Sequence, residues 1–170
     1  GLLALSACGG GSTSSLFTAS TTSGFAQSGP LGNARVFLDY DQDGVFDAGV
    51  DTEVNTLADG SFELTTTEAG MAVAAANANG TYNIVVTVNT DSFGASTTID
   101  STIGGTVSNI HFVAPSGEDN AFGGGSVMVT PATTMIHNLM ALDATLTASA
   151  AKDNVAKALG FTQAEIDAGF

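Results

Sequence analysis

The sequence has little positive charge, one cysteine and no tryptophan. Three Lys and Arg residues stand against 17 Asp and Glu residues, which gives the 170-residue chain a formal net charge of −14. Nucleic acids require clustered cations on the protein that binds them, so this composition excludes a nucleic-acid partner. A single cysteine cannot form an internal disulfide framework. The lack of Trp, with Tyr40 and Tyr82 as the two tyrosines, weighs against the aromatic platforms that often bind sugars.

Sequence motifs of common enzyme classes are also missing. The chain contains no G-x-S-x-G nucleophile elbow and no phosphate-binding loop, and no pair of carboxylates stands out for glycoside hydrolysis. His111 and His137 lie in different predicted elements, and neither neighbours a second type of metal ligand in the sequence. We therefore expect no catalysis and interpret both histidines as polar residues on a strand and a helix.

The first residues resemble the end of a bacterial lipoprotein signal peptide. An apolar stretch leads into Leu5-Ser6-Ala7-Cys8, which matches the lipobox, in which the cysteine thiol receives a diacylglyceryl group. The alternative is a chance apolar patch before a buried cysteine. No initiator Met or basic segment precedes Leu2, so we expect residues 1–8 to be a partial signal peptide outside the fold.

This resemblance implies a location and an anchor. Gly9 follows the cysteine, as is typical of outer-membrane lipoproteins, so we expect an outer-membrane lipoprotein or cell-surface protein in the cell envelope. The membrane would then be a partner through lipidated Cys8. Residues 9–23 are rich in Gly, Ser and Thr and are predicted to form a flexible tether.

Residues 24–116 show the pattern of a β-sandwich. Short runs of alternating or β-branched apolar residues are separated by Gly, Asn and Asp turns. Ala58-Asp59-Gly60 is predicted to be a hairpin turn, and residues 71–76 fit either a strand or a short helical turn. The predicted strands are 34–38, 61–65, 81–88, 96–99 and 106–113, of which 81–88 is expected to be central.

Two segments of this region resemble a known family of sandwiches. Gly29-Pro30-Leu31-Gly-Asn-Ala34-Arg-Val36-Phe-Leu38 and Thr56-Leu-Ala-Asp59-Gly60-Ser-Phe62-Glu-Leu64 are similar to the motifs of carboxypeptidase-regulatory-like or transthyretin-like domains. Asn33 stands where that family often has Gly. The acidic segment inserted between them resembles the calcium-binding B-type repeats of bacterial surface adhesins. The resemblance implies a mainly β, Ig-like/transthyretin-like β-sandwich that serves as a non-catalytic accessory or stalk domain.

The acidic segment Asp39-Tyr-Asp41-Gln-Asp43-Gly44-Val45-Phe-Asp47, here called the acidic loop, has the pattern of a cation site. Alternate carboxylates followed by a glycine suit a loop that curls around Ca²⁺, which binds carboxylate, carbonyl and water oxygens. Counted as an EF-hand, the loop has Val50 at the twelfth place, where a bidentate Glu is required, so we predict a loop between strands instead. Either Asp51 or Glu53 is expected to complete the shell. The predicted ligands are Asp39, Asp41, Asp43, Val45 through its carbonyl, Asp47, Asp51 and Glu53.

The alternative is a solvated acidic turn, because Asp and Gly are common loop residues. The alternation is more ordered than a turn requires, and carboxylates this close would raise one another's pKa values without a cation. We therefore predict a structural Ca²⁺ ion. Mg²⁺ is less suited because it prefers few protein ligands and keeps several waters.

Residues 127–170 are predicted to form a short α-helical C-terminal segment after the glycine cluster 123–125. Thr130 caps a first helix with Pro131 in its first turn, and 149–159 form a second helix that Gly160 ends. Thr162 and Glu165 form a capping box that opens a third helix. The apolar residues of these helices are interpreted as core or interdomain packing.

Together these features predict an exported, lipid-anchored, Ca²⁺-stabilised sandwich. We expect it to act as a structural or interaction module, adhesin-like or stalk-like, of a larger surface protein, with a surface protein or a glycan as its partner. Two alternatives stay open at this stage. One is a carbohydrate-binding module, and the other is an accessory domain of a secreted peptidase or other enzyme.

Overall fold

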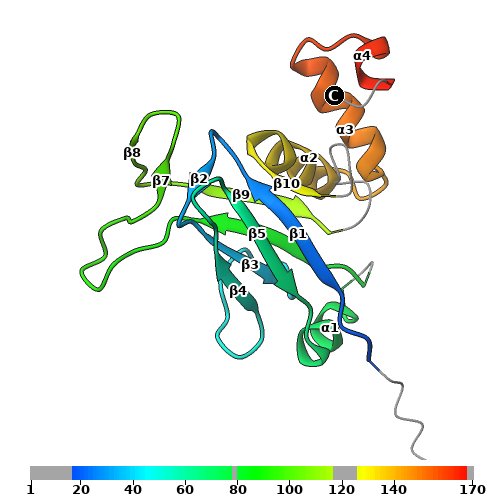
Figure 1. Ribbon diagram of the computed structural model, residues 1–170. Helices are drawn as coiled ribbons and strands as arrows, with labels where there is room; N and C mark the ends of the chain where they lie inside the picture. The colour runs from blue at the N-terminus through cyan, green and yellow to red at the C-terminus, as the bar shows by residue number, and fades with distance from the viewer. Residues whose placement is uncertain (1–16, 78–79, 117–125, 168–170) are drawn as a thin grey trace, which may run out of the picture.

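The computed structural model describes residues 17–77, 80–116 and 126–167. The fold is mainly β, with several sheets and with most helices toward the C-terminal end (Figure 1). Cys8, residues 9–16 of the predicted tether and the glycine cluster 123–125 lie outside the described residues. The lipobox and its lipid therefore stay predictions.

Two sheets enclose the main hydrophobic core. The three-stranded sheet has the order β10–β1–β5, formed by Val127–Val129, Thr21–Ala26 and Ser61–Thr65. The four-stranded sheet has the order β4–β3–β6–β9, formed by Thr52–Asn55, Arg35–Asp39, Asn83–Thr87 and His111–Pro115. Buried side chains from both sheets form one cluster, so the arrangement is compatible with a β-sandwich.

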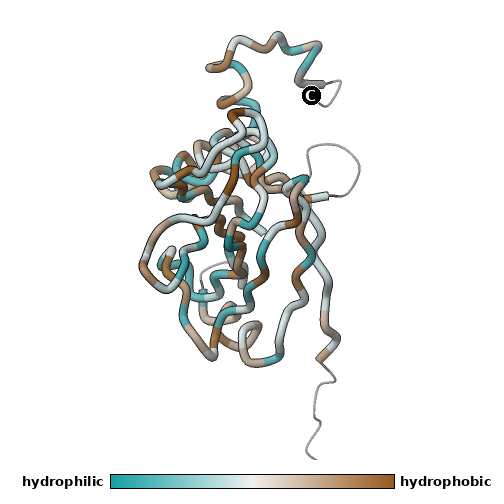
Figure 2. The backbone as a smooth tube through the Cα atoms, turned by 60° about the vertical axis from the view of Figure 1, so that its left-hand side comes forward, coloured by the Kyte–Doolittle hydropathy of each residue, from teal (hydrophilic) through white to brown (hydrophobic). Residues whose placement is uncertain are grey.

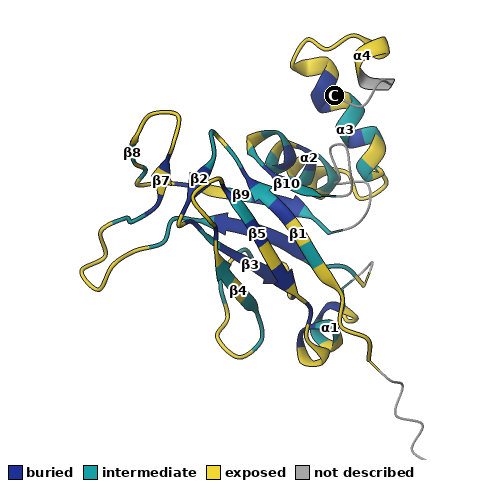
Figure 3. Cartoon of the chain, viewed as in Figure 1, coloured by how far each residue is buried: buried dark blue, intermediate teal, exposed yellow. Residues whose placement is uncertain are grey.

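The period-two pattern explains which side chains reach this core. In β5, Phe62 and Leu64 are buried and their neighbours are exposed or half-buried, and hydrophobic residues recur along the strands (Figure 2). In β3, Val36 and Leu38 join the main core, as predicted for one face. β6 lies between β3 and β9 and is buried along most of its length, which confirms that it is central (Figure 3).

The opposite face of the four-stranded sheet is also covered. Phe37, Val85 and Val113 form a second buried cluster with Phe46 packed against it. The helix α2, Pro131–Leu142, contacts β9 next to this cluster. Burial on both faces explains why β3 and β6 are almost continuously apolar.

The predicted strands 96–99 and 106–113 are only partly correct. A small sheet has the order β2–β7–β8, formed by Leu31–Gly32, Ile99–Asp100 and Gly105–Thr106. The 106–113 run is divided between β8 and β9, because Ser108 and Asn109 interrupt its apolar pattern where the chain passes from one sheet to the other. Residues 96–98 precede β7 rather than belonging to it.

The turn at Ala58-Asp59-Gly60 forms, but it does not join two strands of one sheet. Asp59 accepts hydrogen bonds from the backbone and hydroxyl groups of Ser61 at 3.0 and 2.6 Å, and Gly60 has a φ of 83°. β4 before the turn pairs with β3, whereas β5 after it pairs with β1. The hairpin prediction is therefore wrong, because a tight turn does not determine which sheet each flanking strand joins.

Both predicted boundaries of the sandwich require correction. β1 begins at Thr21, within residues 9–23, because its residues pair with β5 from Thr21 onward. β10 lies beyond residue 116 and pairs in parallel with β1, with Val129 fully buried. The segment predicted as helical from residue 127 therefore starts with a strand of the sandwich itself.

The helices predicted at the caps Thr130 and Thr162 start directly after these residues. Residues 71–74 are helical rather than extended and 75–76 form a turn, since α1, Glu68–Ala74, starts after Thr67, whose side chain accepts from Gly70 N. Thr130 caps α2 in a capping box with Thr133. Ile136 of α2 packs with Ala151 and Val155 of α3, Ala148–Ala158, which α4, Gln163–Asp167, follows.

Candidate metal centre

The loop between β3 and β4 brings three carboxylates together. Asp39 is the last residue of β3 and is fully buried, whereas Asp41 and Asp43 are exposed. Each offers a carboxylate oxygen, and these oxygens all lie within 4.8 Å of one another. We call these residues the acidic cluster. Carboxylates at this spacing can hold a metal ion.

Backbone geometry curls the chain around the acidic cluster. Gln42 and Gly44 have positive φ values of 63° and 79°, a conformation that Gly44 adopts at little cost and that costs Gln42 about 1–2 kcal/mol. Gly44 N donates to Asp39 Oδ2 at 3.0 Å, and Val45 N donates to Asp43 Oδ1 at 2.7 Å. The Gln42 side chain donates to the Thr81 carbonyl at 3.0 Å, which ties the loop to the residues before β6.

Asp39 carries the clearest sign of a missing partner. Its Oδ1 atom is buried and accepts no hydrogen bond among the described residues. A buried polar atom without a partner costs roughly 1–3 kcal/mol, and more when the group is charged. Native structures retain few such atoms without an ion, a water or a functional reason. A cation between the three carboxylates would satisfy this oxygen.

The electrostatics of Asp39 agree with this interpretation. The pKa of Asp39 is raised to about 6, mainly by burial, with smaller upward contributions from a side-chain hydrogen bond with Asp41 and from the charges of Asp51 and Asp41, while the hydrogen bond from Gly44 N lowers it. The pKa rises because burial and the neighbouring carboxylates disfavour the charged form of Asp39. A divalent ion would supply that compensation and hold Asp39 ionised.

Asp51, which follows the acidic loop, stabilises it through hydrogen bonds. Its two carboxylate oxygens accept from Tyr40 N at 3.2 Å and from Asp47 N at 2.9 Å. Burial raises its pKa, and the charges of Asp41 and Asp47 add to that effect. Asp51 is thus close enough to the acidic cluster to interact with it, although it is not one of the three grouped ligands.

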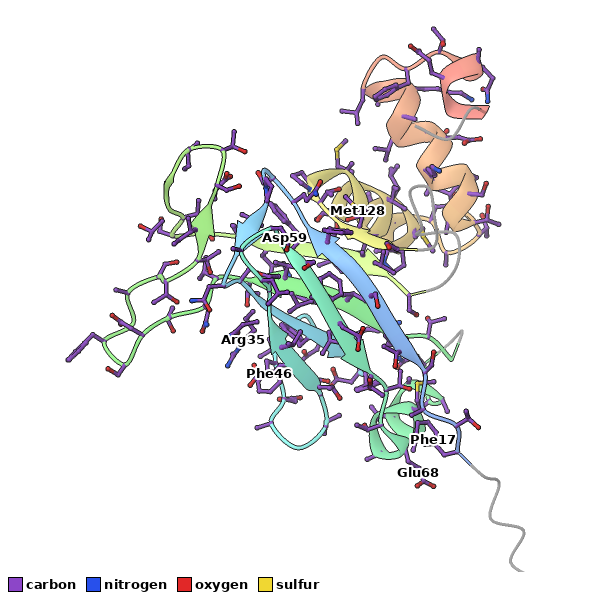
Figure 4. The ribbon with its side chains drawn as sticks, viewed as in Figure 1. Phe17, Arg35, Phe46, Asp59, Glu68 and Met128 are labelled. Carbon is purple, nitrogen blue, oxygen red and sulfur yellow. The ribbon has the colours of Figure 1, made fainter. Side chains whose placement is uncertain are left out.

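The remaining predicted ligands lie outside the acidic cluster. Val45 and Asp47 are exposed, and Asp47 is tied through its backbone to Asp51. Glu53 lies in β4 and forms an ion pair with Arg35 at 2.6 Å. Arg35 also stacks 4.7 Å from the centre of the Phe46 ring, and Figure 4 shows these two side chains next to each other. Of the two acids left open by the sequence, Asp51 is the one near the cluster.

Two residues that the sequence did not connect to the site lie beside it. His111 of β9 and His137 of α2 line the same hollow as Asp39 and Asp43, and the hollow has a volume of about 260 Å³. The His111 ring also lies close to Gly44. No sequence signal links them, because 26 positions separate the two histidines and they come to line one hollow only when α2 packs on β9. Within the described residues neither histidine joins the grouped metal ligands.

Comparison with protein-family models, with curated proteins and with solved structures finds no match to this chain. In the part of the chain that the structure describes, no helix combines the length and the hydrophobicity of a transmembrane span. The functional argument therefore rests on the residues and geometry of the acidic cluster.

Proposed function

We propose that the acidic cluster binds a structural Ca²⁺ ion in a sandwich domain that is exported and lipid-anchored. The observation that carries this proposal is the buried Asp39 Oδ1 atom, which has no partner among the described residues and belongs to a carboxylate grouped with those of Asp41 and Asp43. In this role the ion neutralises part of the negative charge of the chain, whose net charge is −14.

Calcium fits this loop better than magnesium. Ca²⁺ takes about six to eight oxygens at flexible geometry, whereas Mg²⁺ demands a near-ideal octahedron and retains waters. The acidic cluster combines one buried and two exposed carboxylates on a curled loop. Such an irregular arrangement of ligands suits Ca²⁺, which is the larger ion. Asp51 would complete the charge around the ion, and Val45, Asp47 and water would provide further oxygens.

The ion would rigidify the loop rather than act as a switch. Extracellular calcium modules have dissociation constants of roughly 10⁻⁴ to 10⁻³ M. At about ten times the dissociation constant, binding adds about 1.4 kcal/mol to the free energy of unfolding. That contribution is comparable with the cost of the unpartnered Asp39 oxygen, so a weak site suffices.

The wider role is a non-catalytic stalk or interaction module of a larger surface protein. The lipobox motif and Cys8 support an envelope location, and the paired motifs around Val36 and Phe62 support an Ig-like or transthyretin-like sandwich. In this module β10 is an edge strand of the three-stranded sheet, and α2 packs against β9 of the four-stranded sheet. Its task would be to hold or present a partner-binding surface outside the cell.

Calcium titration tests the proposal directly. Isothermal titration with Ca²⁺ is expected to show one site of weak affinity, and the melting temperature is expected to rise with Ca²⁺ and fall with a chelator. Mg²⁺ at the same concentration should give a smaller shift. A melting temperature that is the same with Ca²⁺ and with chelator would overturn the proposal.

A further inference from the structure

The hollow beside the acidic cluster has polar walls from three parts of the fold. The acidic loop contributes Asp39 and Asp43, β9 contributes His111, and α2 contributes His137 and Asn138. Asn83 at the start of β6 lies between them, with its side-chain nitrogen 3.4 Å from His137 Nε2. The walls thus combine carboxylate, imidazole and amide groups around one open space.

An ion in the acidic cluster would have an open side toward this space. Asp39 Oδ2, Asp43 Oδ1 and both oxygens of Asp51 already accept backbone hydrogen bonds. The unpartnered Asp39 Oδ1 belongs to a residue that lines the hollow. Since Ca²⁺ takes about six to eight oxygens, the loop leaves coordination positions for oxygens from outside.

Charge selects the kind of oxygen that can fill those positions. Asp39, Asp41 and Asp43 together carry three negative charges when ionised, which a divalent ion only partly balances. Apart from the two aspartates, the walls have no formally charged side chain, and the two lysines lie on α3. A further carboxylate or phosphate would be repelled, so the site favours neutral oxygen ligands.

The other polar groups suit hydroxyl groups. Amide and imidazole nitrogens donate or accept hydrogen bonds, and a carboxylate accepts them from hydroxyls. A second hollow of about 200 Å³ shares Gln42, Asn83 and His137 with the first and adds apolar wall from Met140 and Leu146. The first hollow, at about 260 Å³, is smaller than the pockets of roughly 300 Å³ and above that hold drug-sized ligands, so it has room for one sugar unit at most.

The tyrosines are not available as a stacking platform. Tyr40 is fully buried, and its ring packs edge-on against Tyr82 with centroids 5.5 Å apart. No Phe or Tyr ring of the described residues lines the hollow, so sugar recognition there would use the ion and the polar walls instead of aromatic stacking.

We propose that the hollow binds a neutral sugar through two vicinal hydroxyl groups. The cation at the acidic cluster takes the two hydroxyl oxygens, and His111, His137 and the amides of Asn83 and Asn138 exchange hydrogen bonds with the same or adjacent hydroxyls. This inference rests on the proposed function, because it requires the ion.

A glycan array tests the inference with the whole protein. The array carries neutral glycans with vicinal hydroxyl pairs, including mannose, fucose and galactose, together with sialylated glycans, and it is probed in Ca²⁺ and in chelator. Neutral glycans are expected to bind in Ca²⁺ and to be lost in chelator. His111→Ala and Asn138→Ala are expected to weaken binding at least tenfold. Asn154→Ala, an exposed helix asparagine outside the hollow, should bind normally.

Melting curves of the same samples separate the two proposals. His111→Ala and Asn138→Ala should keep the Ca²⁺-induced rise in melting temperature. If that rise is present but no glycan binds, or binding survives in chelator or is restricted to sialylated glycans, the sugar inference is wrong and the calcium site stands. If Ca²⁺ does not change the melting temperature, the proposed function fails and the inference fails with it.

Discussion

Arg35 Nε lies 2.6 Å from a carboxylate oxygen of Glu53 across the β3–β4 pair. Glu53, which the sequence offered as an alternative to Asp51 for completing the calcium shell, is thus already paired with a cationic side chain. Asp51 instead accepts hydrogen bonds from the backbone of Tyr40, which lies between Asp39 and Asp41, and of Asp47, which follows the acidic cluster. The two acids, two positions apart, therefore have different tasks.

Substitution of these acids should separate their roles. Asp51→Ala removes the two carboxylate oxygens that accept from Tyr40 N and Asp47 N, together with a nearby charge, so we expect the Ca²⁺ affinity to fall at least tenfold. Glu53→Gln breaks a half-exposed ion pair of the kind that contributes about 0–1 kcal/mol, so the Ca²⁺ affinity should stay within about twofold. Isothermal titration measures both. A larger loss of affinity in Glu53→Gln than in Asp51→Ala would reverse the assignment.

Asp39→Asn should make the protein insensitive to Ca²⁺. The amide nearly preserves the shape of the side chain but removes the buried charge and one ligand oxygen. We expect Asp39→Asn in chelator to be at least as stable as the native chain, because an uncompensated buried carboxylate is costly.

Glu63→Gln on β5 provides the matched control for this substitution. Glu63 is exposed and lies on the other sheet, so the shift of melting temperature with Ca²⁺ should be unchanged. A native-sized Ca²⁺ shift in Asp39→Asn would show that the cation binds elsewhere.

The stability of the calcium-free protein should rise as the pH falls through the range from about 6 to 4.5. The pKa of Asp39 is raised to about 6 in the fold from an ordinary value of 3.8, so the folded state binds more protons than the unfolded state in this window. The raised pKa of Asp51 acts in the same direction. The pKa values of Asp59, Asp143 and Glu165 are lowered in the fold, so these carboxylates have the opposite effect on stability. They stabilise the fold when ionised, and this stabilisation is lost at lower pH.

Chemical unfolding in chelator at several pH values measures this effect. Asp39→Asn should flatten most of the dependence between pH 6 and 4.5. With Ca²⁺ present the trend should weaken or invert, because the ion competes with the proton for Asp39. Stability in chelator that falls steadily on acidification through this window would contradict the prediction.

Gly70→Ala should destabilise the fold by about 1–3 kcal/mol, as overpacking typically does. A Cβ atom on Gly70 would lie 2.2 Å from Cε2 of the buried Tyr40 ring, so ring or helix must shift. Tyr40 directly follows Asp39, and its hydroxyl accepts a hydrogen bond from Thr67 N at 3.1 Å. We therefore expect a weaker Ca²⁺ affinity as well, measured by titration alongside urea unfolding.

Gly105→Ala is the matched control, because a Cβ atom there meets no neighbour within 4 Å. Its free energy of unfolding should stay within about 0.5 kcal/mol of the native value, as at most surface positions. Equal effects of the two substitutions would show that contact with Tyr40 is not the cause.

Shortening the chain tests the corrected boundary of the sandwich. A chain that ends at residue 116 loses β10, whose buried Val129 alone contributes about 1.5–3 kcal/mol, and it leaves Val113 N without its acceptor, Thr134 Oγ1. We expect this chain to be largely unfolded or strongly destabilised. A chain that ends at residue 146 keeps β10 and α2 and should retain the cooperative melting transition and the Ca²⁺ response. Equal stability of the two chains would restore the boundary expected from the sequence.

Local patterns in the sequence were sufficient for several elements. Period-two alternation correctly placed β3 and β5, and the dense apolar run placed β6 at the centre of its sheet. Capping residues located the starts of α2 and α4, where Thr130 and Thr162 accept hydrogen bonds from residues three positions ahead. The acidic cluster was predictable for the same reason, since its three aspartates alternate within five positions of one loop.

Only the tertiary structure decided what depends on residues far apart in the chain. The pairing of β10 with β1, the separation of β4 and β5 into different sheets, and the meeting of His111 with His137 beside Asp39 all arise from long-range packing. The different surroundings of Asp51 and Glu53 also depend on a residue in another strand, since Glu53 forms an ion pair with Arg35 of β3. Composition and spacing report the chemistry of a segment, but the free energy that selects its partners is gained only when distant apolar faces are buried together.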